Sequence, residues 1–370
     1  MNKPVILHEG TYALEDVQAL RSSNPVWKEK DILENQLEEL FVTLFPSLRF
    51  SDKYETKLRE FVQEKKTKGG TWVYFPWNGH FIHMVNEEDY MSLRTNRNKN
   101  LITADEQQVL MSSCIGVAGL SIGSSIALNL VYSGIGNHMK LADLDILETC
   151  NLNRVHAGIY EIGEKKLDKV IQDIYEIHPF IQIDAFENGL TKETLNTFLA
   201  GGVDVVFDEI DDFAMKVLLR MEAKKSRIPV IMMTNLGDTI LVDVERYDLD
   251  PSTPLFNGLI GATPEQILNN PITEKDKIKY AMQIVGIDNI PTRALSSLFE
   301  INKTLVGRPQ LNSTVAASAG IASYLVRRLL LKKSLPSGRR RIVFDEALSL
   351  EKENADNQRN EIVAKLQTLL

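Results

Sequence analysis

Hydrophobic and polar positions in residues 1–93 predict two amphipathic helices followed by a β-hairpin. Apolar residues recur at helical spacing over 29–45 and again over 53–65. Two β-rich runs within 71–85 then flank an Asn-Gly pair. Such a pair between two β-rich runs is a strong hairpin signal. We therefore expect a small mixed segment of helices and a hairpin at the N-terminal side of the chain.

The pattern changes after residue 100, where short apolar runs begin to alternate with helical ones. We expect strands at 114–117, 139–142, 182–186, 203–207, 230–233 and 241–244. Helical periodicity falls between the first pairs of strands, over 123–133 and 164–177. Alternation of this kind is typical of an α/β fold with a doubly wound, mostly parallel, Rossmann-like sheet.

The last third of the chain has a weaker pattern. Residues 250–300 contain several Pro and Gly and predict a long excursion with short helices, whereas 311–332 predict a helix rich in small residues. The last 25 residues predict a polar helix with an apolar tip at Ile362–Leu370. From these patterns we divide the chain into 1–93, 94–250, 251–345 and 346–370.

Composition narrows the class of protein. The chain has 370 residues, a formal net charge of −8 and two cysteines. The acidic balance argues against a protein whose main role is to bind nucleic acid. Two cysteines cannot form a four-cysteine zinc site or a disulfide framework. We find no apolar run of about 18 residues and no signal-peptide pattern, so we expect a cytoplasmic protein that does not bind membranes.

The loop after the first strand of the α/β region points to a nucleotide. Gly119 and Gly123 lie between the strand and the next helix, where backbone N–H groups and the helix N-terminus attract phosphate. Asp143 ends the following strand about 20 residues later, the position at which a Rossmann-like fold binds ribose hydroxyls. A purely structural tight turn is the alternative interpretation. These residues alone do not separate NAD from ATP.

Ordered motifs make the comparison specific. Asp143-Leu-Asp145, followed by Asn-Leu-Asn-Arg at 151–154, resembles the signature of the ThiF/MoeB superfamily of adenylating enzymes, which are related to the ubiquitin-activating enzyme. Ile-Gly-Glu-Lys-Lys at 162–166 resembles the I-G-x-x-K motif of that family. Asp-Glu-Ile-Asp-Asp-Phe at 208–213 resembles its D-x-x-D-N-F motif. We therefore expect the chain to be a divergent member of this family.

The resemblance implies an ATP site and a role for each matching residue. Asp143 would hold the ribose, and Asn151, Arg154 and Lys166 would contact the phosphates. Asp211 would help to hold Mg²⁺. A substrate carboxylate would then attack the α-phosphorus and expel pyrophosphate. Without the motif, Lys166 would be assigned to a solvated face and Asp211 to a helix N-cap.

The resemblance also suggests a homodimer. Arg94-Thr-Asn-Arg97 is similar to the R-x-x-R segment that members of the family insert into the partner subunit's active site. Arg94 and Arg97 would then act in trans on the nucleotide. The alternative interpretation is a solvated polar linker over 94–99.

Two features depart from the family. The loop has Ala118, Leu120 and Ser121 where the family usually has glycine, and Leu120 could crowd the phosphates. Cys114 lies on a predicted buried strand, Cys150 lies inside the motif, and no cysteine follows. Neither the catalytic cysteine nor the zinc-binding C-x-x-C pairs of many relatives are therefore present. The activity, if retained, should stop at an acyl-adenylate.

The sequence leaves several alternatives open. Our leading hypothesis is ATP- and Mg²⁺-dependent adenylation of a carboxylate; the others are a catalytically inactive nucleotide-binding scaffold and an NAD-dependent oxidoreductase. The substrate is a small acid, a peptide or protein C-terminus, or a modified RNA base. The N-terminal helices and hairpin resemble winged modules that hold substrate peptides, or form a packing subdomain. The basic residues at 332–341 are assigned to a solvated turn or to a partner of the acidic tail at 345–353.

Overall fold

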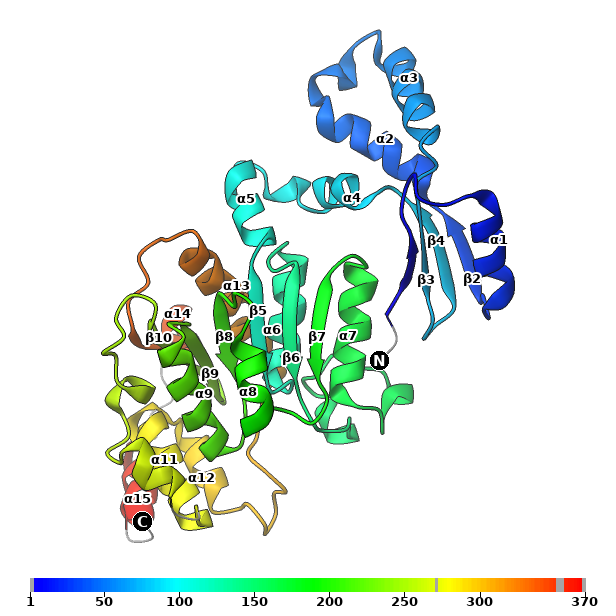
Figure 1. Cartoon of the computed structure of the whole chain (residues 1–370). Helices are drawn as coiled ribbons and strands as arrows, with labels where there is room; N and C mark the ends of the chain where they lie inside the picture. Colours follow the sequence, from blue (N-terminus) through cyan, green and yellow to red (C-terminus); the bar gives the residue numbers. More distant parts are fainter. Residues whose placement is uncertain (1–2, 270–271, 351–355, 368–370) are drawn as a thin grey trace. The chain divides into compact units, whose positions relative to one another are not determined.

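The computed structural model describes residues 3–269, 272–350 and 356–367 (Figure 1). The chain forms two compact units, each with its own sheet. The first comprises 1–111, 131–134 and 171–181, and the second comprises 112–130, 135–170 and 182–370. Residues just after 93 therefore group with the N-terminal segment, whereas the four-part division made from the sequence stays a prediction.

The first unit is built on a four-stranded sheet in the order β1-β3-β4-β2. Its elements are β1 (Val5–Leu7), α1 (Leu14–Ser23), β2 (Lys28–Asp31), α2 (Leu33–Leu44), α3 (Tyr54–Lys66), β3 (Thr71–Phe75), β4 (His80–Met84), α4 (Glu87–Arg94) and α5 (Ala104–Met111). The hairpin of β3 and β4 is confirmed, with Thr71 paired to Met84. Its turn requires Gly79, whose φ is +69° and whose added Cβ would lie 2.7 Å from the Pro25 carbonyl oxygen.

The predicted helix over 29–45 is wrong in its first turn. Residues 28–31 form β2, which pairs in parallel with β4, and α2 begins only at Leu33. The Ile32 N–H donates to the His83 carbonyl at 2.9 Å, and the Asp31 carboxylate accepts from the Leu33 N–H at 3.1 Å. Backbone pairing with the hairpin therefore overrides the helical pattern that begins nearby.

The second unit contains a seven-stranded sheet in the order β11-β10-β9-β8-β5-β6-β7. Its strands are β5 (Cys114–Ala118), β6 (His138–Ala142), β7 (Gln182–Phe186), β8 (Val205–Asp208), β9 (Val230–Leu236), β10 (Thr239–Glu245) and β11 (Gly338–Val343). Strands β9, β8, β5, β6 and β7 are parallel to one another. Strand β10 is antiparallel to both of its neighbours, β9 and β11. The doubly wound, mostly parallel sheet is thus confirmed.

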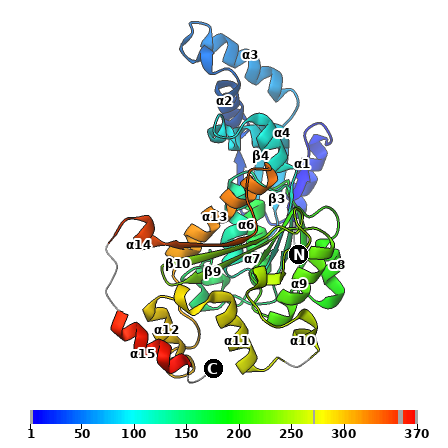
Figure 2. The same ribbon diagram turned by 90° about the vertical axis from the view of Figure 1, so that its left-hand side faces the viewer.

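Helices cover both faces of this sheet. The helices are α6 (Ile122–Tyr132), α7 (Lys166–Ile177), α8 (Lys192–Leu199), α9 (Phe213–Lys225) and α13 (Asn312–Leu330). α6 and α13 lie on one face, and α8 and α9 lie on the other (Figure 2). The small residues of α13 let it pack closely, since Ala319 and Ala322 are buried and Ser318 donates to Asn235 on β9 at 2.7 Å.

Residues 250–300 form the expected excursion of short helices. They comprise a 3₁₀ turn (Leu255–Gly258), α10 (Pro264–Leu268), α11 (Glu274–Val285) and α12 (Thr292–Leu298). α14 (Phe344–Ala347) follows β11, and α15 (Asp356–Gln367) packs on α12 through Ile362, Val363 and Leu366. The rest of the predicted apolar tip, 368–370, lies outside the described residues, as do 351–353 of the acidic tail.

The assignment of the basic cluster to a solvated turn holds for Lys332 and Lys333, which are exposed after α13, but it is wrong for the three arginines. Arg339, Arg340 and Arg341 form part of β11, and Arg339 makes a two-bond ion pair with buried Asp243 at 2.9 and 2.7 Å. Register across β10 and β11 brings the two side chains opposite each other. Arg341 does approach the acidic tail, at 3.3 Å from Glu346.

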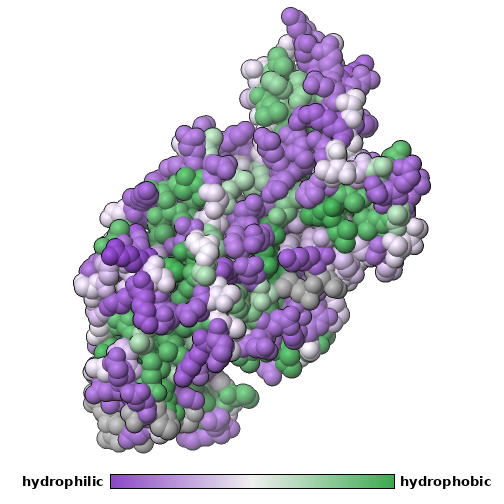
Figure 3. All heavy atoms as spheres, in the orientation of Figure 1, coloured by the Kyte–Doolittle hydropathy of each residue, from purple (hydrophilic) through white to green (hydrophobic). Residues whose placement is uncertain are grey.

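Hydrophilic and hydrophobic side chains are interspersed on the face of the molecule drawn in Figure 3. Among the described residues, no helix is long and apolar enough to cross a membrane.

Candidate functional site

The carboxyl edge of the seven-stranded sheet has a topological switch point. β5 pairs with β6 on one side and with β8 on the other, so the connections that follow β5 and β8 run in opposite directions. Ligands of open α/β sheets bind at such a point, outside the carboxyl ends of the strands. The loops after Ala118, Ala142 and Asp208 meet there, and they carry the motifs recognised in the sequence.

Gly119 in the first loop and Gly123 in the first turn of α6 are each required by close packing. Gly119 has a φ of +89°, donates its N–H to the Ala142 carbonyl at 2.8 Å, and leaves no room for a Cβ, which would lie 2.3 Å from the Glu209 carbonyl oxygen. A Cβ on Gly123 would lie 2.8 Å from a methyl group of Val117. Gly119 therefore joins the loops after β5, β6 and β8, and Gly123 lets α6 pack closely on β5.

Leu120, which the sequence suggested could crowd the phosphates, lies inside the protein. Its side chain is fully buried, so it points into the protein. Its N–H donates to the Asp143 carboxylate at 2.6 Å, and the other oxygen of Asp143 accepts from the Asp145 N–H at 2.8 Å. Burial raises the pKa of the Asp143 carboxyl above its usual value, although these bonds act in the opposite direction. Asp143 therefore fixes the backbone of the glycine turn.

Lys166 begins α7 and faces the same edge. Its Nζ lies 2.8 Å from a carboxylate oxygen of Asp145, and its backbone N–H donates to the Asp145 carbonyl at 3.0 Å. The lysine side chain is only 7% exposed, whereas that of Asp145 is 55% exposed. The Lys166 ammonium is thus held at the edge of the sheet by Asp145, a carboxylate that is accessible to solvent.

Arg154 and Asn151 bring the Asn-Leu-Asn-Arg motif beside the glycine turn. The Arg154 Nε donates to the Ser121 hydroxyl at 3.3 Å, and one Nη donates to the Cys150 carbonyl at 3.2 Å. Asn151 is buried, and its side-chain oxygen accepts from the Glu148 N–H at 3.1 Å. Hydrogen bonds and one ion pair therefore place Gly119, Asp143, Lys166 and Arg154 in one region. The Asn151 side chain instead bonds to the backbone of the turn that contains it.

The acidic pair after β8 divides into two roles. Asp212 is the N-cap of α9 and accepts from the Met215 N–H at 2.7 Å. Asp211 is 95% exposed, and its nearest cation is Arg308 at 4.0 Å. Asp211 is thus not the helix cap that the alternative interpretation suggested.

Sequence reasoning missed the segment 306–311, which precedes α13. Asn153 of the Asn-Leu-Asn-Arg motif donates its side-chain N–H to the Gln310 carbonyl at 2.9 Å, and Arg308 approaches Asp211. No sequence motif marked this segment. Asn153 and Gln310 are more than 150 residues apart in the sequence, and only the folded chain brings them together.

Arg94 and Arg97 belong to the first unit and differ in exposure. The Arg94 guanidinium donates to the carbonyls of Val131 and Ile177, at the ends of α6 and α7, and burial lowers its pKa. Arg97 is exposed. A guanidinium on helix C-terminal carbonyls is favourable, since it meets the negative end of each helix.

Beneath the edge, four charged groups form a buried network. Arg220 contacts Asp208 and lies 2.7 Å from Glu245, and Lys216 lies 3.2 Å from Asp208. Burial acts to raise the pKa of Asp208, but the charges of Lys216 and Arg220 outweigh it and hold that pKa below its usual value. Two positive charges thus balance two negative ones inside the protein.

The same network holds the turn after β10. Glu245 accepts from the Tyr247 hydroxyl at 2.5 Å and from the Phe256 N–H at 2.6 Å, and the Arg220 guanidinium lies 3.9 Å from the centre of the Phe256 ring. Phe256 and Asn257 have φ values of +52° and +53°. The ionic bonds therefore stabilise a strained turn.

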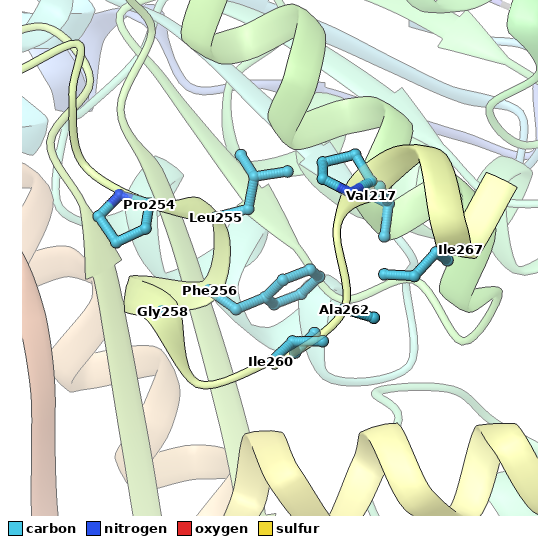
Figure 4. A pocket seen from close by; sticks show the side chains of 9 residues that line it. Val217, Pro254, Leu255, Phe256, Gly258, Ile260, Ala262 and Ile267 are labelled. Atoms are coloured by element: carbon cyan, nitrogen blue, oxygen red, sulfur yellow. The ribbon is translucent and has the colours of Figure 1, made fainter.

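Next to this turn lies an apolar cavity of about 160 Å³. It is lined by Val217 of α9, by Leu255 and Phe256 of the turn, and by Ile260, Ala262 and Ile267 before and within α10 (Figure 4). The lining carries no charged side chain, so the cavity does not suit the phosphates of a nucleotide.

The cysteines and the donor groups limit other chemistries. Cys114 is buried on β5, and burial raises the pKa of its thiol to about 11, which makes it a poor nucleophile. Cys150 is exposed. Within the described part of the chain, no three His, Cys, Asp or Glu side chains are grouped so that they could hold a metal ion.

Comparisons with known proteins agree with the motifs and the fold. The chain is 35% identical over 314 residues to an uncharacterized protein of Mycobacterium tuberculosis (strain CDC 1551 / Oshkosh), MT1398, covering 82% of this chain and 43% of that protein. It is 28% identical over 197 residues to the tRNA threonylcarbamoyladenosine dehydratase of Bacillus subtilis (strain 168), covering 53% and 74%. The chain thus spans less than half of its mycobacterial relative.

A solved structure and a family model extend this agreement. The structure of E. coli MccB with ATP superposes with a TM-score of 0.50 at 15% sequence identity, over 84% of this chain and 85% of MccB, which supports the fold alone. The model of the ThiF family matches residues 94–353. The chain that carries this edge, these motifs and this sheet belongs to the ThiF family.

Proposed function

We propose that this protein is an ATP- and Mg²⁺-dependent adenylating enzyme that acts on a carboxylate and forms an acyl-adenylate without a thioester step. The observation that carries the proposal is the grouping of Asp143, Arg154 and Lys166 around the turn at Gly119. These are the residues to which the motifs assign ribose and phosphate binding, and they lie at the edge where open α/β sheets bind ligands.

Asp143 is suited to the ribose. Its two oxygens already accept the N–H groups of Leu120 and Asp145, which fixes the direction of the carboxylate. Each carboxylate oxygen has a second lone pair, so the group can still accept hydrogen bonds from ribose hydroxyls.

Arg154 and Lys166 are suited to the phosphates. Both carry hydrogen-bond donors and positive charge. Lys166 is paired with the single carboxylate of Asp145, and the Nε of Arg154 donates to the neutral hydroxyl of Ser121. Asn151 would act through the shape of the turn that presents Arg154.

The reaction transfers an adenylyl group. A carboxylate oxygen of the substrate attacks the α-phosphorus, and the bond from that phosphorus to the bridging oxygen breaks, so that its electron pair leaves with pyrophosphate. Positioning and neutralisation of charge dominate such a step. The exposed carboxylate of Asp211 fits Mg²⁺, which proteins often hold through one or two carboxylates besides phosphate and water. When bound, that ion would neutralise phosphate charge.

The proposal ends at the acyl-adenylate because neither cysteine suits a thioester step. Cys114 is buried with a raised pKa, and Cys150 lies within the phosphate-binding motif, where an acyl group would occupy the site. An external nucleophile would then take the acyl group.

We also propose a homodimer in which Arg97 acts on the partner's nucleotide. Arg94 has carbonyl partners within its own unit, so the exposed Arg97 is the better candidate of the pair. Mixing Arg97→Gln with Lys166→Ala protomers tests this arrangement. A mixed dimer has one intact site, so about a quarter of the wild-type activity should return. Two inactive variants that stay inactive together would contradict it.

The first unit suits a substrate with an extended segment. β1 and β2 are the edge strands of its sheet, and every residue of Lys28–Asp31 is exposed. An extended peptide can add to such an edge through backbone hydrogen bonds. A peptide or protein C-terminus is therefore the substrate class that we would test first. Protection of the β2 amides from hydrogen exchange by a bound peptide would support it.

Exchange of labelled pyrophosphate into ATP in the presence of candidate carboxylates tests the main proposal. We expect exchange that needs both the carboxylate and Mg²⁺, together with an adenylate mass in the reaction mixture. Absence of ATP binding by calorimetry would exclude the proposal.

A nucleotide-binding protein without catalysis is the second candidate. The N–H groups of Gly119 and Leu120 already donate to protein oxygens. The turn therefore has fewer backbone donors left to bind phosphate, which favours this candidate. ATP binding without exchange for any carboxylate would support this candidate. Preference for NAD over ATP would instead revive the oxidoreductase hypothesis.

A further inference from the structure

The segment 306–311 lies against two of the motifs at the edge of the seven-stranded sheet. The side chain of Asn153 donates to the Gln310 carbonyl at 2.9 Å. Two residues earlier, an Nη of Arg308 lies 4.0 Å from an oxygen of Asp211. All four residues belong to the second unit. The segment therefore brings a guanidinium to Asp211, which the proposed function assigns to Mg²⁺, and is bonded to the motif that contains Arg154.

The contact between Arg308 and Asp211 is weak. The arginine side chain is 58% exposed, the aspartate side chain is 95% exposed, and their separation is at the long end for an ion pair. Exposed pairs of this kind contribute little to the stability of a protein. Arg308 can therefore leave Asp211 for a ligand anion at little cost to the stability of the fold.

The edge also needs donors other than the backbone of the glycine turn. The N–H groups of Gly119 and Leu120 are bonded to the Ala142 carbonyl and to Asp143. A triphosphate carries several charges, and Arg154 and Lys166 alone offset only part of them. A third cation from the same chain would compensate for the altered loop.

We propose that Arg308 binds the phosphate chain of ATP from within the same chain, beside Arg154 and Lys166. The inference rests on the proposed function and deepens it. Its planar guanidinium carries five N–H donors and matches pairs of phosphate oxygens. The bond from Asn153 to Gln310 links its segment to the phosphate-binding motif. Asp211 holds Arg308 in the nucleotide-free protein and exchanges that contact for the metal when the nucleotide binds.

Calorimetric titration of the full chain with ATP and with AMP tests the assignment. Arg308→Gln should weaken ATP binding about tenfold, the loss expected for one charged hydrogen-bond pair, and should change AMP binding less than twofold. Arg308→Lys should retain part of the affinity, because it keeps the charge but loses the paired donors. Lys303→Gln, an exposed lysine in the same loop, is the matched control and should bind ATP like the wild type.

Asp211→Asn gives a second measurement that needs no turnover. Without Mg²⁺, this variant should bind ATP more tightly than the wild type, because Arg308 no longer has a carboxylate beside it. In the Arg308→Gln background the gain should shrink, and the difference measures the coupling of the two residues.

Each outcome decides the matter. Equal ATP affinity of Arg308→Gln and Lys303→Gln would overturn the assignment, and so would equal losses for ATP and AMP. Unchanged ATP affinity with a raised KM for a carboxylate would move Arg308 to the substrate. A wild-type chain that binds no ATP would refute the proposed function itself, which separates that failure from failure of the Arg308 assignment alone.

Discussion

Charged groups at the edge of the seven-stranded sheet differ from those beneath it. At the edge, Lys166 and Arg308 each face one aspartate that is more than half exposed. Beneath it, Arg220 and its two carboxylate partners are completely buried. Water can replace the partners of the first kind but not those of the second. An ion pair by itself therefore does not indicate ligand binding, and the exposure of the partner distinguishes the cations that we propose to bind a ligand from the buried cations of the network.

The first unit repeats this contrast. Arg94 is held by two helix-end carbonyls, whereas Arg97 is exposed. His178, near Arg94, is buried and packs against the rings of Tyr90 and Phe180. The interior groups of both units should therefore govern stability, and the edge groups should govern binding and turnover.

The largest effect should follow from breaking the buried network. Arg220→Gln leaves buried Glu245 without a cation and leaves Asp208 with Lys216 alone, so the free energy of unfolding should fall by about 3–5 kcal/mol. Urea denaturation followed by circular dichroism measures the change. Tyr247→Phe removes only one hydroxyl donor to Glu245 and should cost about 1 kcal/mol. Equal stability of Arg220→Gln and the wild type would contradict the structural role.

Acid should destabilise the protein through His178. Burial lowers its pKa from 6.5 to about 3, and the nearby Arg94 charge adds to the shift. Between these values the unfolded chain binds a proton that the folded chain does not. The contribution of neutral His178 to the free energy of unfolding is therefore fully present above about pH 6.5. It is lost as the pH drops toward 3, by up to about 4 kcal/mol.

Urea midpoints at pH 7 and pH 4.5 measure this slope. His178→Asn should flatten it even if the variant is less stable at pH 7. A slope that the substitution leaves unchanged would assign the acid sensitivity to other groups.

Lys166→Ala should act on turnover and spare the fold. If Lys166 binds phosphate as we propose, its loss should reduce pyrophosphate exchange about 100-fold to 1000-fold, as expected for a donor that acts on the transition state. Its partner Asp145 is more than half exposed and can be solvated instead, so the free energy of unfolding should change little. Lys165→Ala, which breaks an exposed pair with Glu187, is the matched control and should keep full activity.

Substitutions of Arg94 and Arg97 should have the smallest effects, and their effects on the free energy of unfolding should differ. Arg94→Gln should lower the free energy of unfolding by about 2 kcal/mol, because it removes charged bonds to the carbonyls of Val131 and Ile177. Arg97→Gln should stay within about 0.5 kcal/mol of the wild type, as exposed substitutions usually do. Thermal unfolding of both variants makes the comparison, and the reverse order would refute it.

Much of the fold could be predicted because its signals are local. The hairpin followed from Asn78-Gly79 between two β-rich runs, and the parallel sheet followed from alternating strand and helix patterns. β2 and β11 were missed, because both are short or highly charged strands whose pairing partners are distant in sequence. A charged run predicts a solvated segment unless a partner strand is known.

The candidate site divides in the same way. The sequence by itself determined the family motifs, and with them Gly119, Asp143, Arg154 and Lys166, since their identity and spacing survive without knowledge of contacts. Only the tertiary structure decided that Leu120 is buried, that Arg94 lies on helix ends and that Arg308 approaches Asp211. Burial and long-range contact depend on how distant segments pack, and no local pattern encodes that packing.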